Sequence, residues 1–371
     1  MRVVCVAGAR PNFMKVAPVL VALDDAGADT VLVHTGQHYD EAMSQVFFEE
    51  LDIRKPDEYL GVGSGTHAEQ TARVMVAFEE LLTTVPADAV VVVGDVNSTL
   101  ACSIVAAKSG VLVAHVEAGL RSRDWSMPEE VNRVVTDRVS DYLFAPSADA
   151  VDNLRVEGYR DDQIHLVGNV MVDTLLRNVE RARARGLPPE LGLTAGKYAL
   201  LTLHRPSNVD DPATLARLLG ALGTVATEIP IVFPAHPRTR ERLAGIDVPS
   251  GIVLTPPLGY LDFLAMQAGA AVVLTDSGGI QEETTALGVP CLTLRETTER
   301  PITVSEGTNR LVGTDPGAIV EAARAVLRGE VTRRCPPLWD GAAAPRIAEI
   351  LMHGGTAAQR LRPTALPERR S

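Results

Sequence analysis

The chain has 371 residues, of which 46% are hydrophobic and 22% are charged, a balance typical of globular proteins and unlike that of disordered ones. This length exceeds what one hydrophobic core usually serves, so we expect two domains. The formal net charge is −12 and the Lys and Arg residues are scattered, which excludes nucleic acid as an expected partner because its phosphates would be repelled.

The cysteines and the apolar segments indicate a cellular compartment. The four cysteines form no C-x-x-C pair, and three of them lie inside apolar patterns, which favours buried thiols in a reducing compartment over disulfides. The N-terminal apolar run stops at Gly8, too early for a signal peptide, and no stretch approaches the roughly 18 apolar residues of a membrane helix. We therefore expect a cytoplasmic protein with no membrane partner.

The first half of the chain alternates two kinds of segment. Short runs rich in Val, Ile and Leu are continuous, as expected for strands covered on both faces, and segments with helical periodicity separate them. The predicted strands are 3–7, 30–34, 89–93, 111–116 and 142–145, and the predicted helices are 16–26, 41–51, 67–82 and 99–109. This alternation predicts a parallel sheet with right-handed crossovers.

The same rhythm starts again after a charged helix at 173–185 and a Gly- and Pro-rich link at 186–196. Further strands are predicted at 198–203, 231–233, 252–254, 271–275 and 291–294. We therefore predict two α/β domains, 1–169 and 170–371. The last helical pattern, 344–352, belongs to the second domain by position, and its return to pack on the first domain is left open.

Open α/β sheets bind ligands beyond the carboxyl ends of their strands, so the polar residues at those exits are candidates for a site. At the first exit, Pro11 is placed to open a helix, and Arg10 and Lys15 would bring cations to its N-terminus, a combination suited to phosphate. Two solvated cations on a capped helix explain the pattern equally well, and this exit has no G-x-G-x-x-G or Walker loop.

Acidic side chains follow later strands of the first half. Asp95 comes directly after 89–93, either as a helix cap or as a functional group. Glu117 follows a strand expected to be buried, where an unpaired charge is costly, which favours a functional role. Glu129 lies in the first turn of a helix and Arg133 four positions later on the same face, so ordinary helix support and catalysis both explain that pair.

The second half offers different groups at its strand exits. In chain order they are His204, His236, Ser277, Gly278, Gly279, Glu283 and Arg300. Neither histidine fits a zinc pattern, so we expect no catalytic metal. The serine and the two glycines would leave backbone N–H groups uncovered at a helix start, an anion site suited to a diphosphate, with a plain Gly-rich turn as the alternative. The glutamate is placed to accept bonds from ribose hydroxyls, and the arginine is a further cation for phosphate.

Together these motifs resemble the non-hydrolysing UDP-N-acetylglucosamine 2-epimerases, which interconvert the UDP derivatives of N-acetylglucosamine and N-acetylmannosamine. The resemblance runs from Gly8 to about Gly313 and touches nearly every strand exit. It implies two Rossmann-like domains with a cleft between them, the glycosyltransferase-B architecture. It also implies a UDP-sugar substrate, a homodimer, no metal or redox cofactor, and a product used in polysaccharide or secondary-metabolite synthesis.

The resemblance also implies roles for matching residues. The acids implicated in proton transfer correspond to Asp95, Glu117 and Glu129, and the catalytic set includes His204, which lies near the phosphates. The substrate-binding residues correspond to Arg10, Lys15, Arg133, His236, the phosphate loop Ser277, Gly278 and Gly279, the ribose ligand Glu283, and Arg300. The implied reaction eliminates UDP from C1 as a proton leaves C2, and UDP then adds back to a 2-acetamidoglucal. Clustered carboxylates suit this because burial and like charges raise a pKa of about 4 toward the working pH.

The chain departs from the family pattern in several places. Many bacterial members bind activating substrate through a Gln-His-Arg stretch and an arginine, whereas residues 37–40 read Gln-His-Tyr-Asp and Glu69 stands near the arginine's position. Pro206 replaces the second arginine of a His-Arg-Arg-Glu-Asn motif, and Asn12 replaces a glutamate after Arg-Pro. These departures put substrate activation in doubt. A hydrolysing epimerase, a glycosyltransferase of the same fold and a non-catalytic UDP-sugar sensor are the competing functions.

Overall fold

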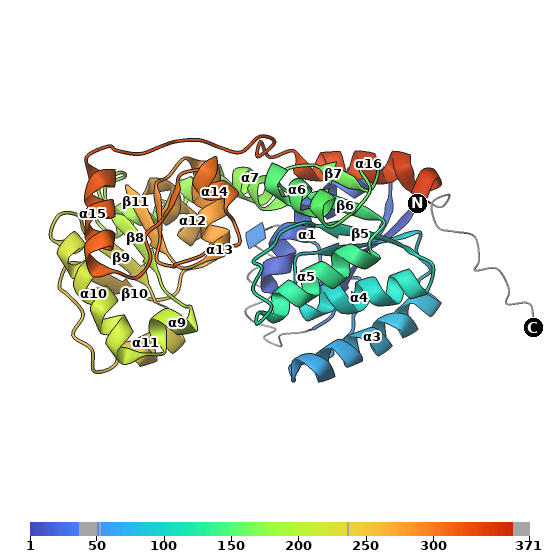
Figure 1. Cartoon of the computed structure of the whole chain (residues 1–371), viewed down its shortest axis with the longest axis horizontal. Helices are drawn as coiled ribbons and strands as arrows, with labels where there is room; N and C mark the ends of the chain where they lie inside the picture. The colour runs from blue at the N-terminus through green and yellow to red at the C-terminus, as the bar shows by residue number, and fades with distance from the viewer. Residues whose placement is uncertain (37–49, 52, 236, 359–371) are drawn as a thin grey trace, which may run out of the picture. The chain divides into compact units, whose positions relative to one another are not determined.

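A computed structural model of the chain describes residues 1–36, 50–51, 53–235 and 237–358. The chain divides into two compact units, one formed by Met1–Thr174 with Asp340–Ser371 and the other by Leu175–Trp339. Figure 1 follows the chain through them. The division lies inside α7 (Val170–Ala184), a helix that begins where the sequence analysis placed the domain boundary. Within the described ranges, no helix combines the length and apolar character needed to cross a membrane.

The first unit is built on a seven-stranded sheet in which all strand pairs are parallel. The strand order is β3-β2-β1-β4-β5-β6-β7. The strands are β1 (Arg2–Ala7), β2 (Asp29–His34), β3 (Glu58–Tyr59), β4 (Ala89–Val93), β5 (Leu112–Val116), β6 (Tyr142–Ala145) and β7 (Ile164–Leu166). The inner strands β4 and β5 are buried along their whole length, which explains their continuous apolar sequences.

Helices from both ends of the chain pack on this unit. They are α1 (Arg10–Asp25), α3 (His67–Thr84), α4 (Asn97–Lys108), α5 (Pro128–Val139), α6 (Ala148–Val156) and α16 (Ala343–Ala358). The C-terminal helix α16 contacts α1. The carboxylate of Asp173 accepts the backbone N–H groups of Ala343 and Ala344, at 3.1 and 2.7 Å, and so satisfies two donors at the start of α16.

The second unit is a six-stranded parallel sheet with the order β10-β9-β8-β11-β12-β13. Its strands are β8 (Ala199–Thr202), β9 (Ile231–Pro234), β10 (Ile252–Thr255), β11 (Val272–Thr275), β12 (Cys291–Thr293) and β13 (Asn309–Leu311). Its helices are α8 (Leu187–Glu190), α9 (Pro206–Val209), α10 (Pro212–Ala226), α11 (Pro237–Leu243), α12 (Tyr260–Gly269), α13 (Gly278–Leu287), α14 (Ile302–Ser305) and α15 (Pro316–Leu327). The apolar face of α10 contributes to the largest core cluster on this sheet.

Both sheets reverse their strand order beside the first strand. In the first unit β1 lies between β2 and β4, and in the second unit β8 lies between β9 and β11. Parallel sheets of this kind bind ligands beyond the carboxyl ends of their strands at such a reversal. We therefore expect ligand-binding residues on the segments that follow β1, β4, β8 and β11.

Every predicted strand overlaps an observed one, and the predicted α/β fold class is confirmed. Three strands were not predicted, namely β3, β7 and β13. Each lies at a sheet edge, with β3 exposed and β7 and β13 only partly buried, so its sequence lacks the apolar run that marks an inner strand. The helix predicted at 41–51 falls almost wholly outside the described residues.

Candidate active site

The candidate residues of the first unit lie around the reversal between β1 and β4. Lys15 lies on α1, Asp95 lies between β4 and α4, and Glu117 directly follows β5. Glu129 and Arg133 lie on α5. All five therefore belong to segments that begin at the carboxyl edge of one sheet, as the sequence analysis predicted from the order of strands and exits.

Lys15 and Glu117 form a buried ion pair. Lys15 Nζ lies 2.5 Å from Glu117 Oε2, and the two side chains are 13% and 3% exposed. The backbone of Glu117 is left-handed, with φ of 72°, a conformation that is costly for a non-glycine residue and that concentrates at functional sites. The second oxygen, Oε1, is buried and accepts no hydrogen bond from the described residues. Glu117 thus holds a carboxylate oxygen that the fold does not satisfy.

Asp95 is paired with Arg133. The Nε of Arg133 lies 2.9 Å from Oδ2 of Asp95, and Arg133 also forms an ion pair with Glu130. No ion pair joins Glu129 to Arg133 within the described chain. Glu129 does lie in the first turn of α5, where a negative charge supports a helix. Glu130 and Arg133 share the buried face of α5, and Glu129 does not.

The two neighbouring glutamates of α5 have different surroundings. Glu130 is buried and accepts the backbone N–H groups of Ser122 and Arg123, both at 2.9 Å. Burial alone would raise the pKa of Glu130, but these N–H donors and the Arg133 charge lower it, so Glu130 is an ionised structural anchor. Glu129 is half-buried and makes no ion pair within the described part of the chain. Of the two, Glu129 is therefore the one available to a substrate.

Asn12 joins the exits of two strands. Its Oδ1 accepts the N–H of Ala9 at 2.9 Å, and its Nδ2 donates to the carbonyl of Val93 at 3.1 Å. The residue is 2% exposed. An amide donates and accepts at once, whereas the glutamate that is usual at this position cannot donate when ionised. This bridge between the ends of β1 and β4 explains how the chain accommodates that departure.

In the second unit, His204 follows β8 and Asp276 follows β11, one on each side of the strand reversal. The His204 side chain is 55% exposed and the Asp276 side chain is fully buried. Oδ2 of Asp276 also accepts the N–H of Arg205 and the amide of Asn208, at 3.0 and 3.1 Å. Burial alone would raise the pKa of Asp276, but its hydrogen bond with His204 and the other donors lower it. Asp276 therefore acts as the anchor of the His204 turn.

Sequence reasoning assigned no role to Asp276, although the same signal that selected Glu117 was present. Asp276 is a charged residue directly after a buried strand, and it is itself 0% exposed. A buried carboxylate of this kind needs several donors, so it either anchors a loop or serves a ligand. Here the neighbouring turn supplies the donors.

The predicted phosphate loop forms the start of α13. Ser277 is the N-cap residue, Gly278 is the first helical residue, and the Ser277 side chain does not cap the helix. A Cβ at Gly279 would meet nothing within 4 Å, so the backbone is open to approach there. A Cβ at Gly278 would clash with Glu299, which explains the glycine at that position. An uncapped helix start with open backbone donors is suited to an anion.

Glu283 and Arg300 lie deeper in the same unit. Burial raises the pKa of the Glu283 carboxyl to about 8, with the Gln267 amide opposing the shift and the charge of Glu282 adding to it. The Nε of Arg300 lies 2.8 Å from Oε1 of Glu282, and both side chains are buried. Arg300, predicted as a cation for phosphate, is thus already neutralised by a carboxylate of α13.

Three of the candidate positions cannot be placed in full. His236 and the departing stretch 37–40 lie outside the described residues. Arg10 is the first residue of α1, and its side chain is outside the description as well. Their predicted roles in substrate binding or activation stay predictions.

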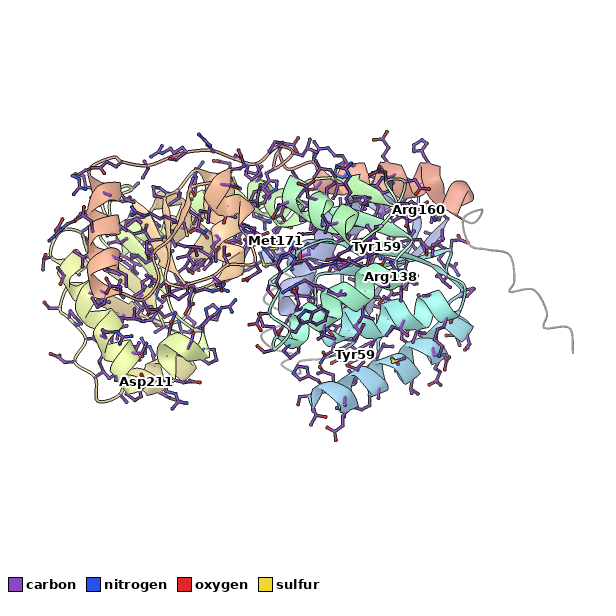
Figure 2. The ribbon with its side chains drawn as sticks, in the orientation of Figure 1. Tyr59, Arg138, Tyr159, Arg160, Met171 and Asp211 are labelled. Carbon is purple, nitrogen blue, oxygen red and sulfur yellow. The ribbon has the colours of Figure 1, made fainter. Side chains whose placement is uncertain are left out.

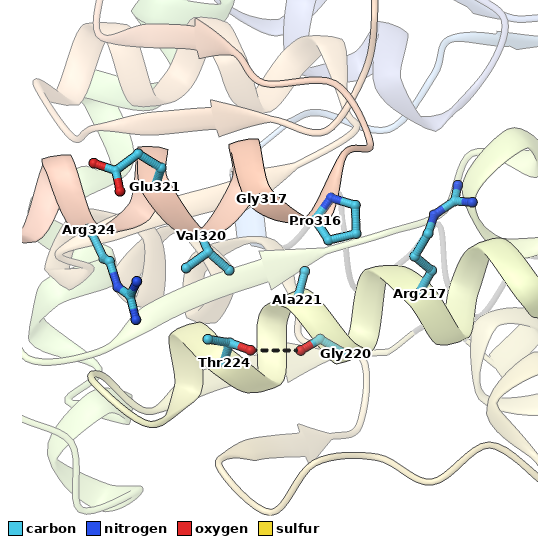
Figure 3. A pocket seen from close by; sticks show the side chains of 9 residues that line it. All are labelled: Arg217, Gly220, Ala221, Thr224, Pro316, Gly317, Val320, Glu321 and Arg324. Atoms are coloured by element: carbon cyan, nitrogen blue, oxygen red, sulfur yellow. Dashed lines mark hydrogen bonds between the residues drawn. The ribbon is translucent and has the colours of Figure 1, made fainter.

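Two surface pockets in the described part of the chain are lined by none of the candidate residues. One, of about 510 Å³, lies between α10 and α15, where Ala221 and Val320 face each other and Arg217 and Arg324 stand at the sides (Figure 3). The other, of about 480 Å³, lies beside α5. It includes Arg138, whose guanidinium lies 5.6 Å from the centre of the Tyr159 ring, and both residues are labelled in Figure 2.

The chain is similar to known proteins over nearly its whole length. The family model described as UDP-N-acetylglucosamine 2-epimerase matches residues 22–352. A UDP-N-acetylglucosamine 2-epimerase of Methanocaldococcus jannaschii is 41% identical over 366 residues, which cover 95% of this chain and 100% of the relative. A UDP-2,3-diacetamido-2,3-dideoxy-D-glucuronate 2-epimerase of Pseudomonas aeruginosa is 40% identical over 356 residues, which cover 95% of this chain and 99% of the relative.

Solved structures agree with this result. The crystal structure of the M. jannaschii UDP-GlcNAc 2-epimerase in complex with UDP-GlcNAc and UDP superposes with a TM-score of 0.85 at 40% identity, covering 95% of this chain and 100% of that one. The two parallel sheets and their strand exits define an α/β enzyme with two Rossmann-like units of the glycosyltransferase-B type. Within that class, the chain belongs to the UDP-N-acetylglucosamine 2-epimerase family. The resemblance inferred from the motifs is confirmed.

Proposed function

We propose that the chain interconverts UDP-N-acetylglucosamine and UDP-N-acetylmannosamine by inverting the configuration at C2. Family membership supports this activity, because relatives that are 41% identical carry it in their names. The observation that carries the proposal is the state of Glu117. Its backbone is in the left-handed region, its carboxylate is paired with Lys15, and one buried carboxylate oxygen accepts nothing from the described residues. That oxygen is an acceptor for a substrate proton.

The chemistry follows from the position of the reacting hydrogen. The hydrogen at C2 is not next to a carbonyl, so its direct removal would leave an unstabilised carbanion. In the proposed reaction a carboxylate takes the C2 proton, the C–H electrons form a C1–C2 double bond, and the C1–O bond breaks with its electrons on the diphosphate of UDP. The resulting 2-acetamidoglucal takes a proton on the opposite face as UDP rebonds to C1. The steps balance without a redox cofactor or a metal.

The residues of the first unit are assigned to the proton. Asp95 and Glu117 form ion pairs with Arg133 and Lys15, and we assign both carboxylates to the proton transfer. Glu129 makes no ion pair within the described chain and completes the acidic set. A proton must be removed from one side of the sugar ring and added on the other. The three carboxylates lie on segments that begin at one edge of the sheet, and they supply the groups for both steps.

The residues of the second unit are assigned to UDP. The backbone N–H groups of Gly278 and Gly279, with Ser277 and His204, would hold the diphosphate and stabilise the charge that develops when the C1–O bond breaks. Glu283 would accept bonds from the ribose hydroxyls. Arg300 would bind phosphate while it stays paired with Glu282, so the two anions would share its charge. Arg10, Lys15 and Arg133 of the first unit, together with His236, complete the proposed substrate-binding set.

Deuterium exchange tests this function. The protein is incubated with UDP-N-acetylglucosamine in deuterated water, and the products are followed by NMR and mass spectrometry. We expect deuterium at C2 and the manno epimer still linked to UDP. Free N-acetylmannosamine would instead establish a hydrolysing epimerase, transfer of the sugar to an acceptor would establish a glycosyltransferase, and binding without exchange would establish a sensor.

A second substrate has a specific observation in its favour. The P. aeruginosa relative, named for a UDP-2,3-diacetamido-2,3-dideoxy-D-glucuronate 2-epimerase, is 40% identical, against 41% for the M. jannaschii enzyme. Both names describe inversion at C2, and the sugars differ at C3 and C6. The same exchange assay with both nucleotide sugars, compared by kcat/KM, decides which one the chain prefers.

The proposal includes a cytoplasmic homodimer. The buried cysteines Cys5, Cys102 and Cys291 are free thiols, which agrees with a reducing compartment. Light scattering on the purified protein gives the assembly directly, and a mass of one chain would contradict the dimer. Fractionation of the cells that produce the protein tests its compartment.

A further inference from the structure

His115 is a polar residue in the middle of an apolar strand. It lies on β5, between Ala114 and Val116, and it is fully buried. Burial removes the hydrogen bonds that an imidazole makes to water, and leaving them unreplaced is destabilising. The ring of His115 must therefore find its partners within the protein. The sequence analysis used the neighbouring Glu117 and assigned nothing to this histidine.

Both ring nitrogens of His115 face acceptors. Nε2 lies 2.8 Å from the carbonyl oxygen of Gly94, and Nδ1 lies 2.6 Å from Oδ1 of Asp137. A carbonyl oxygen can only accept, so Nε2 carries a proton. Asp137 is ionised, because burial alone would raise its pKa but His115 and Arg121 lower it. The ring therefore bridges the carboxylate of Asp137 and the carbonyl of Gly94.

The rest of the network balances the charges. Oδ2 of Asp137 accepts the N–H of Gly119 at 3.1 Å and lies 2.7 Å from a guanidinium nitrogen of Arg121. Arg121 in turn forms an ion pair with Glu157 at 2.7 Å. Arg121 thus meets two carboxylates, so the charge of the buried Asp137 is paired within the fold.

The Gly94 turn is where the proposed catalytic groups converge. Gly94 has φ of 67°, and a Cβ at this position would lie 3.0 Å from Lys15 Nζ and 3.4 Å from Glu117 Oε2. Asp95 is the next residue. The turn is tied to α5 at two points, since Arg133 contacts the Asp95 side chain and Asp137, one helical turn later, reaches Gly94 through His115.

We propose that His115 is a positioning residue of the epimerase, and that its imidazole bridge from Asp137 to the Gly94 carbonyl fixes the Gly94 turn, and with it Asp95, against Glu117. This inference rests on the proposed function. It goes beyond that function because His115 touches no substrate atom in it. Loss of the bridge would let the turn shift, and shifts of about 1 Å in a catalytic group cost about 100-fold in rate.

Two substitutions separate the two ends of the bridge. His115→Asn keeps an amide donor at the place of Nδ1, toward Asp137, and removes the donor to Gly94. His115→Gln places its amide donor at the position of Nε2, toward Gly94, and removes the bond to Asp137. The readouts are kcat and KM for UDP-N-acetylglucosamine, deuterium incorporation at C2, UDP affinity by calorimetry, and the thermal midpoint.

We expect His115→Asn to lower kcat about 10- to 100-fold and His115→Gln to recover most of that loss. UDP affinity should stay unchanged in both, because the residues assigned to UDP belong to the second unit. A folded His115→Asn with the kcat of the unchanged protein would overturn the proposal. Should His115→Asn fail to fold, His115→Gln decides, since a folded Gln variant that is active supports the bridge to Gly94 and an inactive one refutes it. Absence of C2 exchange in the unchanged protein would instead refute the proposed function.

Discussion

The Nδ1 of His204 lies 3.0 Å from Oδ1 of the buried Asp276, across the strand reversal of the second unit. A carboxylate in this position orients an imidazole and selects which nitrogen carries its proton. The same carboxylate accepts backbone N–H groups from the turn that carries the histidine. The exposed His204 ring is therefore held through Nδ1, and its second nitrogen, Nε2, lies outside this network.

Asp276→Asn should weaken both functions of this carboxylate. The new amide nitrogen is a donor and would face N–H groups whose hydrogen bonds the carboxylate now accepts. We therefore expect a loss of about 1–3 kcal/mol in the free energy of unfolding. We also expect kcat to fall about 10- to 100-fold, the usual range for a residue that orients a functional side chain. Urea unfolding and steady-state kinetics measure the two effects. Asp262→Asn, which breaks a surface pair with Arg185, is the control and should change neither quantity much.

Glu117→Gln should abolish deuterium exchange at C2 while UDP affinity stays nearly intact. The substitution keeps the size of the side chain but removes the charge that takes the proton, and the groups assigned to UDP lie in the other unit. Exchange is followed by NMR, and UDP binding by calorimetry. A fully active variant would remove Glu117 from the proposed mechanism, and a large loss of UDP affinity would show that the residue acts on binding instead.

The adjacent glutamates of α5 form a matched pair for mutagenesis. Glu130 accepts from Ser122 and Arg133 through Oε2 and from Arg123 through Oε1. Glu130→Gln removes the charge and replaces one of these oxygens with an amide donor, so we expect a loss of about 1–3 kcal/mol in the free energy of unfolding. Glu129→Gln should change that free energy by less than about 0.5 kcal/mol, as is usual for a partly exposed side chain outside such a network. It should nevertheless lower kcat about 100-fold or more if Glu129 handles a proton. The opposite pattern would exchange the two roles.

The sequence was enough to predict the sheets and the candidate segments, and physical reasons limit what it predicts beyond them. Inner parallel strands are buried on both faces, so β4 and β5 were visible as apolar runs. The edge strands β3 and β13 are partly exposed and left no such signal. Candidate residues were found because ligand sites in these folds follow the carboxyl ends of strands, which a strand pattern already locates.

The pairing of side chains could not be predicted in the same way. Both Glu129 and Glu130 are close enough along α5 to reach Arg133, and the rotation of the helix, which depends on tertiary packing, decides that Glu130 does so. His115 was overlooked because its strand reads as core, and its partners Gly94 and Asp137 come from distant segments. A polar residue inside an apolar strand is the signal that would have selected it.

The raised pKa of Glu283 predicts a pH-dependent stability. Burial raises this pKa to about 8, above the value of about 4.3 for glutamate in an unfolded chain. The folded state therefore binds the proton more tightly, so the stabilisation is complete below about pH 4 and is lost as the pH rises toward 8. Glu283→Gln cannot titrate, and its free energy of unfolding should change less over this window. Urea unfolding at several pH values tests this, and equal slopes for both proteins would contradict it.

The same proton should be coupled to UDP binding. A carboxyl group with a pKa of about 8 is mostly protonated at pH 7, whereas a ligand for ribose hydroxyls acts best as an ionised acceptor. Binding of UDP should therefore release a proton, and UDP affinity should rise from pH 6 to pH 8. Calorimetry at pH 7 in buffers of different ionisation enthalpy counts the released protons. Glu283→Gln should bind UDP more weakly and release none through this group. Proton release that is equal in both proteins would show that Glu283 does not contact the ribose as an ionised acceptor.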